Sequence, residues 1–300
     1  MSATISVSGL SRCYRSHLAL DGVTLEVEGP VVVGLLGRNG AGKSTLMRIL
    51  AAQERPSSGH VSVLGGPVWE NDEALRRLVL VREDQEYPDV KVRDAVRAAS
   101  WFHPNWSAGL AEAMIEDFEL PPGRAIKKLS RGMRSALGIV VGIASRAEVT
   151  LLDEPYAGLD PLARRTFYER LLADYAEHPR TVLLSTHLID EAAGLMERVV
   201  LIDHGRVVLD APADDVRGGA TAVTGSASSV DRFVADRPVW ERRLLGAQQS
   251  VVMPGLLDEV DWARAQQMHL DLKPLSLQEM VVYAAGGAWR SVRAKEEACV

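Results

Sequence analysis

The chain has 300 residues, 47% of them hydrophobic, and a formal net charge of −6 at pH 7. This length and apolar content suffice for a buried core and suggest about two domains. The negative charge excludes a global positive field that would draw the protein to nucleic acid or acidic lipid. Two cysteines near opposite ends, Cys13 and Cys299, indicate neither a disulfide framework nor a metal site, and they fit a reducing compartment.

No segment of the sequence is typical of export or of membrane insertion. The N-terminus lacks the charged and apolar regions of a signal peptide. No apolar run reaches about 18 residues, the length that indicates a transmembrane helix. We therefore expect a soluble protein, for which any role at a membrane would depend on a partner.

Short β-rich segments surround one glycine-rich loop in the first part of the chain. Apolar patterns predict strands at residues 4–7, 19–27, 31–36, 60–64 and 78–81, with a turn at Asp21-Gly22. Residues 45–53 predict a helix directly after the loop. These segments indicate a small antiparallel sheet that flanks the core carrying the loop.

From Pro88 onward the pattern becomes helical. Helices are predicted at residues 90–101, 108–120 and 133–145, with breaks at Pro104 and Pro121-Pro122. Strands and helices then alternate: strands at 149–152 and 181–185, helices at 162–176 and 189–196, and a hairpin of 199–202 with 206–209. Such alternation predicts a parallel α/β sheet, interrupted by a helical insert of about residues 88–145.

The composition changes near residue 217, where we place a domain boundary. Residues 218–300 repeat the mixed pattern on a smaller scale, with a strand at 221–224, helices at 230–235, 256–268 and 277–284, and a charged end at 291–300 expected to fray. We predict a first domain of residues 1–217 and an accessory α+β domain of residues 218–300. No motif links the accessory domain to chemistry, so tuning of dimerisation, binding of a regulator and capping of the core all stay open.

The glycine-rich loop matches the pattern G-x-x-x-x-G-K-[ST] of the P-loop, and its context of strand, loop and helix is the one the motif requires. Its backbone N–H groups and the following helix would cradle phosphate oxygens. Lys43 would reach the β- and γ-phosphates, and Ser44 would place its hydroxyl on Mg²⁺. The predicted phosphate-binding residues are Gly37, Arg38, Asn39, Gly40, Ala41, Gly42, Lys43, Ser44 and Thr45. The alternative is a plain glycine turn.

Two carboxylates follow the predicted buried strand at residues 149–152. A carboxylate at the carboxyl end of such a strand, beside a P-loop, lies where Mg²⁺ must be held, which predicts this role for Asp153. Glu154 is then placed to polarise an attacking water as a general base. The alternative is an acidic turn without chemistry.

Together these motifs resemble, in the family's order, the nucleotide-binding subunits of ABC transporters, over about residues 3–217. The resemblance implies a P-loop NTPase (RecA-like) core with an antiparallel β subdomain and a helical insert, with ATP and Mg²⁺ as cofactors. Residues 151–155 match the Walker B strand and glutamate, and residues 157–160 match the D-loop, which ends in Asp160. His187 matches the switch histidine that contacts the γ-phosphate, and is grouped with Glu154 and Lys43 as catalytic. Tyr14 matches the aromatic that stacks on adenine, and the alternative is an aromatic residue packed on the surface.

Two places depart from the family pattern. The signature reads Leu-Ser-Arg-Gly-Met at residues 129–133, where Ser130 and Gly132 keep the hydroxyl and the close backbone approach that serve a γ-phosphate. An ordinary serine cap is the alternative. In the Q-loop, either Glu83, which keeps the usual offset from the strand, or Gln85, which keeps the residue type, fills the position. With Gln85, the expected metal ligands are Ser44, Gln85 and Asp153.

The resemblance implies an ATPase subunit of a transporter, cytoplasmic and peripheral on the inner face of the cell membrane. One P-loop site would be closed by Ser130 and Gly132 of a second ATP-binding subunit, identical or not, in a head-to-tail dimer. The D-loop, with Asp160 as a further nucleotide-binding residue, would face that subunit. A transmembrane permease subunit is the other expected partner, with residues 88–106 as its docking surface, unless the aromatic residues there form the insert's own core. Export is favoured, and nucleic acid is not an expected partner. The alternatives are a soluble ABC ATPase acting on ribosomes or DNA, and a non-enzymatic nucleotide switch.

Overall fold

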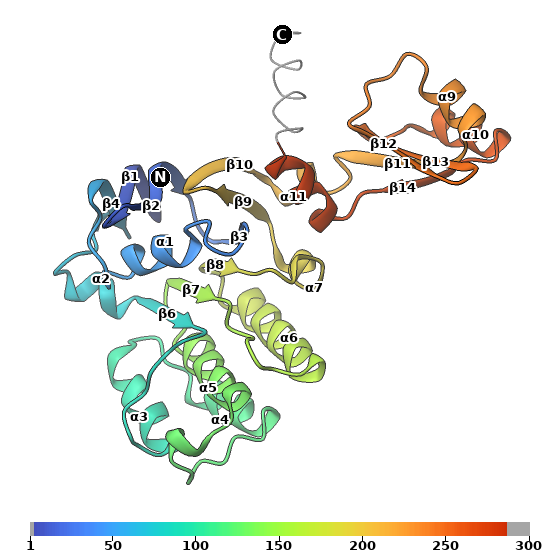
Figure 1. Ribbon diagram of the computed structural model, residues 1–300. Helices are drawn as coiled ribbons and strands as arrows, with labels where there is room; N and C mark the ends of the chain where they lie inside the picture. Colours follow the sequence, from blue (N-terminus) through green and yellow to red (C-terminus); the bar gives the residue numbers. More distant parts are fainter. Residues whose placement is uncertain (1–2, 287–300) are drawn as a thin grey trace. The chain divides into compact units, whose positions relative to one another are not determined.

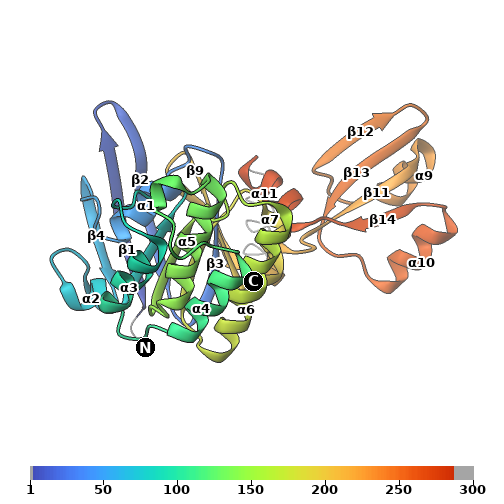
Figure 2. The ribbon, with the colours of Figure 1, turned by 90° about the horizontal axis from the view of Figure 1, so that it is seen from below.

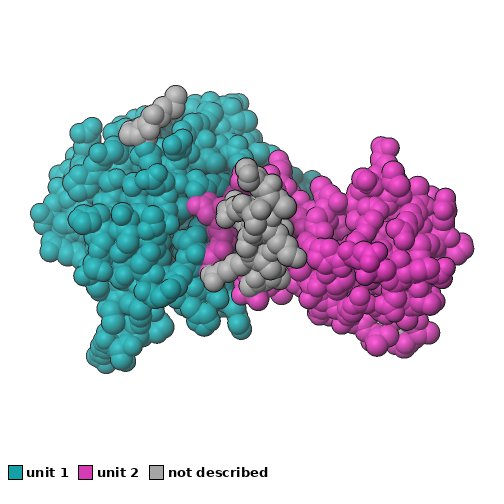
Figure 3. Space-filling view, turned by 90° about the horizontal axis from the view of Figure 1, so that it is seen from above, with its two compact units in different colours: residues 1–188, 195–207 teal, residues 189–194, 208–300 magenta. Residues whose placement is uncertain are grey.

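The computed structural model describes residues 3–286, apart from the side chain of residue 245. The chain forms two compact units, shown in Figure 3: residues 1–188 with 195–207, and residues 189–194 with 208–300. The charged segment 291–300, expected to fray, lies outside the described residues. The domain boundary expected at residue 217 stays a prediction.

A six-stranded sheet forms the centre of the first unit (Figure 1), with the strand order β10-β9-β3-β8-β7-β6. Strand β3 pairs in parallel with β8 and β9, and β7 pairs in parallel with β6 and β8. Its strands are β3 (Val31–Leu36), β6 (Leu78–Arg82), β7 (Val149–Asp153), β8 (Thr181–Ser185), β9 (Arg198–Asp203) and β10 (Arg206–Pro212). Strands β7 and β8 are buried throughout, which explains why their sequences are continuous apolar runs.

Parallel pairing brings the carboxyl ends of β3, β7 and β8 to one edge of the sheet. Strand β3 leads into the glycine-rich loop and helix α1 (Lys43–Leu50), β7 ends at Asp153, and β8 ends at Ser185. The register places Asp153 beside Ser185 and Leu35 beside Ser185. In open α/β sheets ligands bind outside this edge, so the fold gathers the predicted motifs where a ligand is expected.

A four-stranded antiparallel sheet flanks the core, in the order β2-β1-β4-β5. Its strands are β1 (Ile5–Tyr14), β2 (His17–Val27), β4 (Ser58–Val63) and β5 (Gly66–Pro67). The predictions for the first two strands were too short, and Asp21-Gly22 lies inside β2 instead of forming a turn. The pairing of β1 with β2 shifts register at several places, and such bulges let β2 continue through Asp21 and Gly22.

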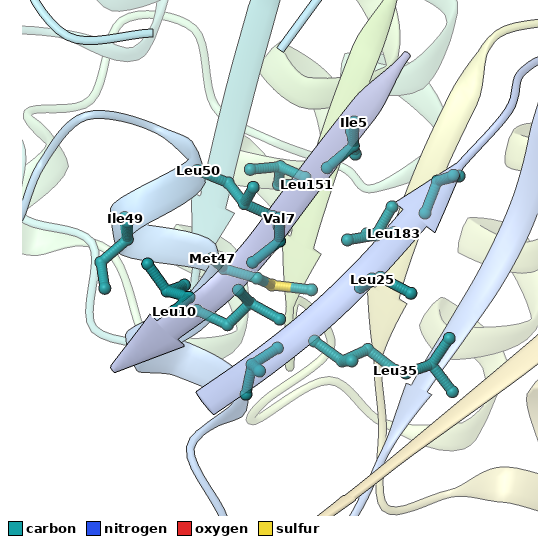
Figure 4. Close-up of a cluster of buried hydrophobic side chains, with 14 of the residues drawn as sticks. Ile5, Val7, Leu10, Leu25, Leu35, Met47, Ile49, Leu50, Leu151 and Leu183 are labelled. Carbon is teal, nitrogen blue, oxygen red and sulfur yellow. The ribbon is translucent and has the colours of Figure 1, made fainter. Parts of the chain in front are cut away.

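The main core lies between helix α1 and the two sheets (Figure 4). Val7 and Leu10 of β1 point toward Met47 and Leu50 of α1, and Leu151 of β7 lies in the same cluster. All five side chains are buried. Burying α1 in this way fixes the loop that precedes it against the sheet edge.

Helices α3 (Val92–Phe102), α4 (Ala108–Asp117) and α5 (Arg131–Ala144) form the predicted insert, with α3 and α4 both packed against α5 (Figure 2). Helix α5 also packs on β6 and β7, so the insert is anchored to the sheet. Helix α5 begins two residues before its predicted start, because Ser130 caps it by accepting from the Met133 N–H at 3.2 Å. The short helix α2 (Asp72–Arg76), the 3₁₀ turn η1 (Ile126–Lys128) and helix α6 (Pro161–Glu177) complete the unit.

The second unit contains an antiparallel sheet with the order β12-β13-β11-β14. The chain order of strands and helices is β-α-β-β-α-β, and the pairing is that of the split β-α-β fold. Its elements are β11 (Ala220–Ser226), α9 (Ala227–Val234), β12 (Glu241–Leu245), β13 (Gln248–Pro254), α10 (Glu259–Gln267), β14 (Asp271–Pro274) and α11 (Leu277–Ala285), preceded by α7 (Ile189–Ala192), η2 (Ala193–Leu195) and α8 (Ala213–Val216). The α+β class of this unit is confirmed, but three of its four strands were not predicted.

Candidate functional site

A cleft of about 680 Å³ lies at the carboxyl edge of the six-stranded sheet. The loop before α1 and the start of α1 supply one wall. Residues from distant parts of the chain supply the others. Of the residues predicted from the sequence, the cleft is lined by Tyr14, Asn39, Gly40, Gly42, Lys43, Ser44, Thr45, Glu83, Glu154 and His187.

The loop itself has the backbone of a phosphate cradle. Gly42 has a φ of 112° and precedes α1, and a Cβ there would lie 2.6 Å from the Ala19 carbonyl oxygen. Gly40 has a φ of 80° and faces open space, so the loop leaves room above it. Gly37, Arg38 and Ala41 do not line the cleft but shape the loop: the Ala41 N–H donates to the Arg38 carbonyl at 3.1 Å. A side chain at Gly42 would destroy this close approach.

Lys43 is a buried cation at the floor of the cleft. Its Nζ donates to the carbonyl oxygens of Gly37 at 2.7 Å and Arg38 at 3.2 Å. Burial lowers the pKa of Lys43, and the charges of Glu154 and Asp153 oppose this effect. The charges of Glu154 and Asp153 offset only part of the cost of burying the Lys43 charge, so the site favours an anionic ligand.

Asp153 and Ser185 are joined at the ends of β7 and β8. The Ser185 hydroxyl donates to Asp153 Oδ1 at 2.6 Å and accepts from the Glu154 N–H at 3.1 Å. Asp153 is buried. Within residues 3–286 no cluster of three or more His, Cys, Asp or Glu side chains could hold a metal ion. A metal here would need oxygens from a ligand as well, which is how Mg²⁺ is held beside phosphates.

Glu154 and His187 contact each other inside the cleft. The His187 Nδ1 lies 2.7 Å from Glu154 Oε2, and since a carboxylate only accepts, Nδ1 carries the proton and donates. The Tyr156 hydroxyl donates to the same oxygen at 2.6 Å. The other oxygen, Oε1, is buried and has no hydrogen-bond partner among the described residues. One carboxylate oxygen is therefore fixed by two donors, and the other receives no hydrogen bond from the described residues.

The two candidates for the Q-loop position have different surroundings in the structure. Glu83 lines the cleft, and its N–H donates to the Asp153 carbonyl at 3.1 Å. Gln85 lines a neighbouring pocket instead, where its Oε1 accepts weakly from the Arg82 N–H at 3.4 Å. Glu83 therefore lies at the cleft and Gln85 does not, while the role of Gln85 as a metal ligand stays a prediction.

Glu83 also forms an ion pair with Arg131. Glu83 lies in the turn after β6 and Arg131 lies at the start of α5, so the two segments in which the sequence departs from the family pattern contact each other. Both residues line the cleft and the neighbouring pocket.

Tyr14 lies at the mouth of the cleft. Its hydroxyl donates to Glu54, and the Arg12 guanidinium lies 4.6 Å from the centre of its ring. One face of the ring is thus covered by a cation. A base stacked on Tyr14 would use the other face.

Ser130, Gly132 and Asp160 do not join the P-loop cleft in this chain. They line a separate cavity of about 430 Å³. Asp160 caps α6 by accepting from the Ala163 N–H at 2.9 Å, just as Ser130 caps α5. Gly132 approaches the D-loop closely, since a Cβ there would lie 2.4 Å from the Gly158 carbonyl oxygen.

Sequence reasoning missed Tyr156 and Ser185, which bind Glu154 and Asp153. Both residues are brought to the site by contacts between the segments at the ends of β7 and β8. In the sequence, their position near the ends of two buried strands was the one feature that could have indicated them. The fold and cleft together define a P-loop ATPase.

The comparisons with known proteins agree with this class. Residues 20–157 match the family model described as "ABC transporter". The chain is 35% identical to the "Daunorubicin/doxorubicin resistance ATP-binding protein DrrA" of Streptomyces peucetius, over 71% of this chain and 66% of that protein. It is 30% identical to the "Daunorubicin resistance ATP-binding protein DrrA3" of Streptomyces coeruleorubidus, over 94% of this chain and 96% of that protein.

A solved structure described as "Structure of ATP binding subunit of ABC transporter" is similar, with a TM-score of 0.64 and 27% identity over 71% of this chain and 91% of the other. The chain belongs to the ABC transporter family, as an ATP-binding subunit with ATPase activity. No described helix has the length and apolar character required to cross a bilayer.

Proposed function

We propose that this chain hydrolyses ATP to drive an exporter whose membrane-spanning permease is a separate subunit. The relatives named for drug resistance, and others named "Nod factor export ATP-binding protein I", support the direction. The observation that carries the proposal is the meeting of Lys43 and Glu154 in one cleft, with one carboxylate oxygen that has no hydrogen-bond partner among the described residues. A buried cation opposite an available base is what hydrolysis of a phosphoanhydride requires.

The triphosphate of ATP lies in the loop of residues 37–45, against the N-terminus of α1. Lys43 supplies positive charge to the phosphates, which also completes its own poorly compensated environment. Tyr14 offers its free ring face to adenine, with stacking worth roughly 1–3 kcal/mol. Ser44 and Asp153 would hold Mg²⁺, which would supply charge stabilisation at the phosphates.

Glu154 acts as the general base. Its Oε1 accepts a proton from the attacking water, while Oε2 is held by Tyr156 and His187. Because His187 donates through Nδ1 to Glu154, its Nε2 is the atom left for the γ-phosphate, and it donates to a phosphate oxygen when the ring carries its second proton. Positioning and charge account for catalysis in this site, since phosphoryl transfer needs little covalent assistance from the protein.

A second ATP-binding subunit completes the site. Ser130, Gly132 and Asp160 lie in a cavity apart from the P-loop cleft, so one chain cannot bring them to its own nucleotide. In the proposed dimer the signature at the N-terminus of α5 faces the nucleotide of the other subunit. That N-terminus, with the Ser130 hydroxyl, suits a γ-phosphate.

The permease is proposed to dock on the aromatic end of α3, which would hold the protein at the inner, cytoplasmic face of the cell membrane. Trp101 is 71% exposed and Phe102 is 62% exposed, so neither serves as core of the insert. Exposed aromatics in adjacent positions are typical of a docking surface. Co-purification from membranes with an integral membrane protein supports this partner, and recovery with ribosomes or DNA instead contradicts it.

The variant Glu154→Gln tests the catalytic assignment. It should bind ATP with the affinity of the wild type yet lose turnover by about 10²-fold or more, the scale of a lost general base. Phosphate release and nucleotide binding are measured on the same preparation. Glu191→Gln, a substitution of the same kind outside the cleft, should keep wild-type turnover. Normal turnover by Glu154→Gln would contradict the assignment.

A further inference from the structure

Tyr156 lies two residues after Glu154 and is 2% exposed. Its hydroxyl contacts three groups: Glu154 Oε2 at 2.6 Å, Thr186 Oγ1 at 2.5 Å and the His187 backbone nitrogen at 3.1 Å. These groups come from the segments after two different strands, β7 and β8. No motif of the sequence assigns this residue a role.

The direction of each hydrogen bond follows from what the groups can do. A carboxylate only accepts, so the tyrosine donates its one proton to Glu154. A backbone N–H only donates, so His187 uses one lone pair of the phenol oxygen. The Thr186 hydroxyl then donates to the second lone pair, while accepting from the Leu188 N–H at 2.8 Å. The hydroxyl of Tyr156 is fully used, which fixes its orientation.

The ring is held as firmly as the hydroxyl. It packs edge-on against the His187 imidazole, with ring centres 5.7 Å apart, and against Tyr168. Burial and the neighbouring Glu154 raise the pKa of Tyr156 above its usual range, so the phenol keeps its proton at physiological pH. The residue is thus a permanent donor to the carboxylate.

We propose that Tyr156 is a positioning residue that holds the Glu154 carboxylate and the His187 imidazole in one geometry before nucleotide arrives. The proposal rests on the catalytic role of Glu154 proposed above. With Oε2 bound by the Tyr156 and His187 donors, the carboxylate cannot rotate freely, and Oε1 is directed to the reacting water. The same hydroxyl also links the segments after β7 and β8, so the base and the histidine keep a constant separation.

The variant Tyr156→Phe keeps the ring and removes only the hydroxyl. We expect kcat to fall about 10-fold or more, the usual result of losing a hydrogen bond to a charged group, with KM for ATP within about twofold of the wild type. Tyr175→Phe is the matched control, because Tyr175 also donates to a glutamate, Glu197 at 2.7 Å, but outside the cleft. It should leave kcat unchanged.

A second measurement needs no nucleotide. In ¹⁵N spectra of the imidazole nitrogens, His187 should show the Nδ1–H form in the wild type and tautomer averaging in Tyr156→Phe, with His187→Ala giving the assignment. In a double-mutant cycle, Tyr156→Phe should cause no further loss in the Glu154→Gln background, since it acts through Glu154. Should Tyr156→Phe not fold, Thr186→Ala gives the same spectral change and a loss of about 3-fold.

The outcomes separate this proposal from the one on which it rests. If Glu154→Gln keeps normal turnover, the general base is wrongly assigned. If Glu154→Gln loses turnover but Tyr156→Phe retains wild-type kcat, or if the His187 signal does not change, the role of Tyr156 is overturned. An additive loss in the double variant overturns it as well.

Discussion

At the residue scale, the buried charge of Lys43 costs the nucleotide-free protein stability. Burial disfavours its charge, and the folded protein offers two carbonyl oxygens and the more distant charges of Asp153 and Glu154 in return. A lysine whose pKa is lowered by folding destabilises the folded state below that pKa. The loss of stability is relieved as the pH rises through the lowered pKa of the folded state toward the ordinary lysine pKa of 10.5. In the proposed function, the phosphates of bound ATP would supply the missing negative charge.

Replacing Lys43 by methionine should therefore leave the nucleotide-free protein at least as stable as the wild type, while abolishing the rise in melting temperature that ATP causes. The wild type should gain stability relative to this variant as the pH rises toward about 10. Thermal unfolding with and without ATP at several pH values measures both effects. Lys128→Met, at an exposed position, should keep the ATP-dependent rise. Retention of that rise by Lys43→Met would contradict the assigned phosphate contact.

Helix α6 depends at the element scale on a buried ion cluster at its C-terminal end. Asp174 accepts from Arg180 at 2.8 Å and from Arg146 at 2.8 Å, and the side chains of Asp174 and Arg180 are 2% and 4% exposed. Burial lowers the pKa of Arg180, and Asp174 opposes this effect. The cluster connects α6 to the segments that precede β7 and β8, so it supports the strands that carry Asp153 and Ser185.

Removing the carboxylate would leave a buried guanidinium uncompensated. Asp174→Ala should therefore lower the free energy of unfolding by about 3–5 kcal/mol. Glu169→Ala on the same helix is the control: its pair with Arg165 is 62% and 76% exposed, so it should lower the free energy by about 0.5 kcal/mol or less. Urea denaturation measures both. Equal effects of the two variants would show that the cluster is not a stabilising element.

The elements that could be predicted from the sequence are those whose signal is local. Strand β3, the loop of residues 37–45 and α1 form one continuous pattern, and β7 and β8 are continuous apolar runs. Strand β12 (Glu241–Leu245) was missed because its run of charged residues lacks the alternation that a half-buried strand shows. The contacts of Tyr156 and the different surroundings of Glu83 and Gln85 were beyond prediction, because both depend on which side chains the neighbouring strand ends bring together.

At the scale of the whole molecule, the chain combines an ATPase unit with a second unit of the split β-α-β fold. The relative DrrA3 matches over 94% of this chain, so its likeness extends into the second unit, whereas the likeness to DrrA covers 71%. The ATPase unit holds the P-loop cleft and a separate cavity at Ser130, which the proposed function treats as two halves of one site. This division predicts that two chains are needed for one complete site.

The variant Ser130→Asp separates pairing from folding. Aspartate caps helices as well as serine does, so α5 should keep its N-terminus, but its charge would repel a γ-phosphate from the other subunit. We expect this variant to bind ATP as a monomer. Ser226→Asp is the matched control, because Ser226 caps α9 in the second unit in the same way, accepting from the Ser229 N–H at 3.2 Å.

The most direct test of the account is the mass of the Glu154→Gln protein in solution with ATP and Mg²⁺, measured by light scattering after size-exclusion chromatography. The account predicts a dimer that forms only with nucleotide, persists because hydrolysis is blocked, is lost when Ser130→Asp is added and is kept with Ser226→Asp. A Glu154→Gln protein that binds ATP and stays monomeric, or that pairs equally well with Ser130→Asp, would contradict it.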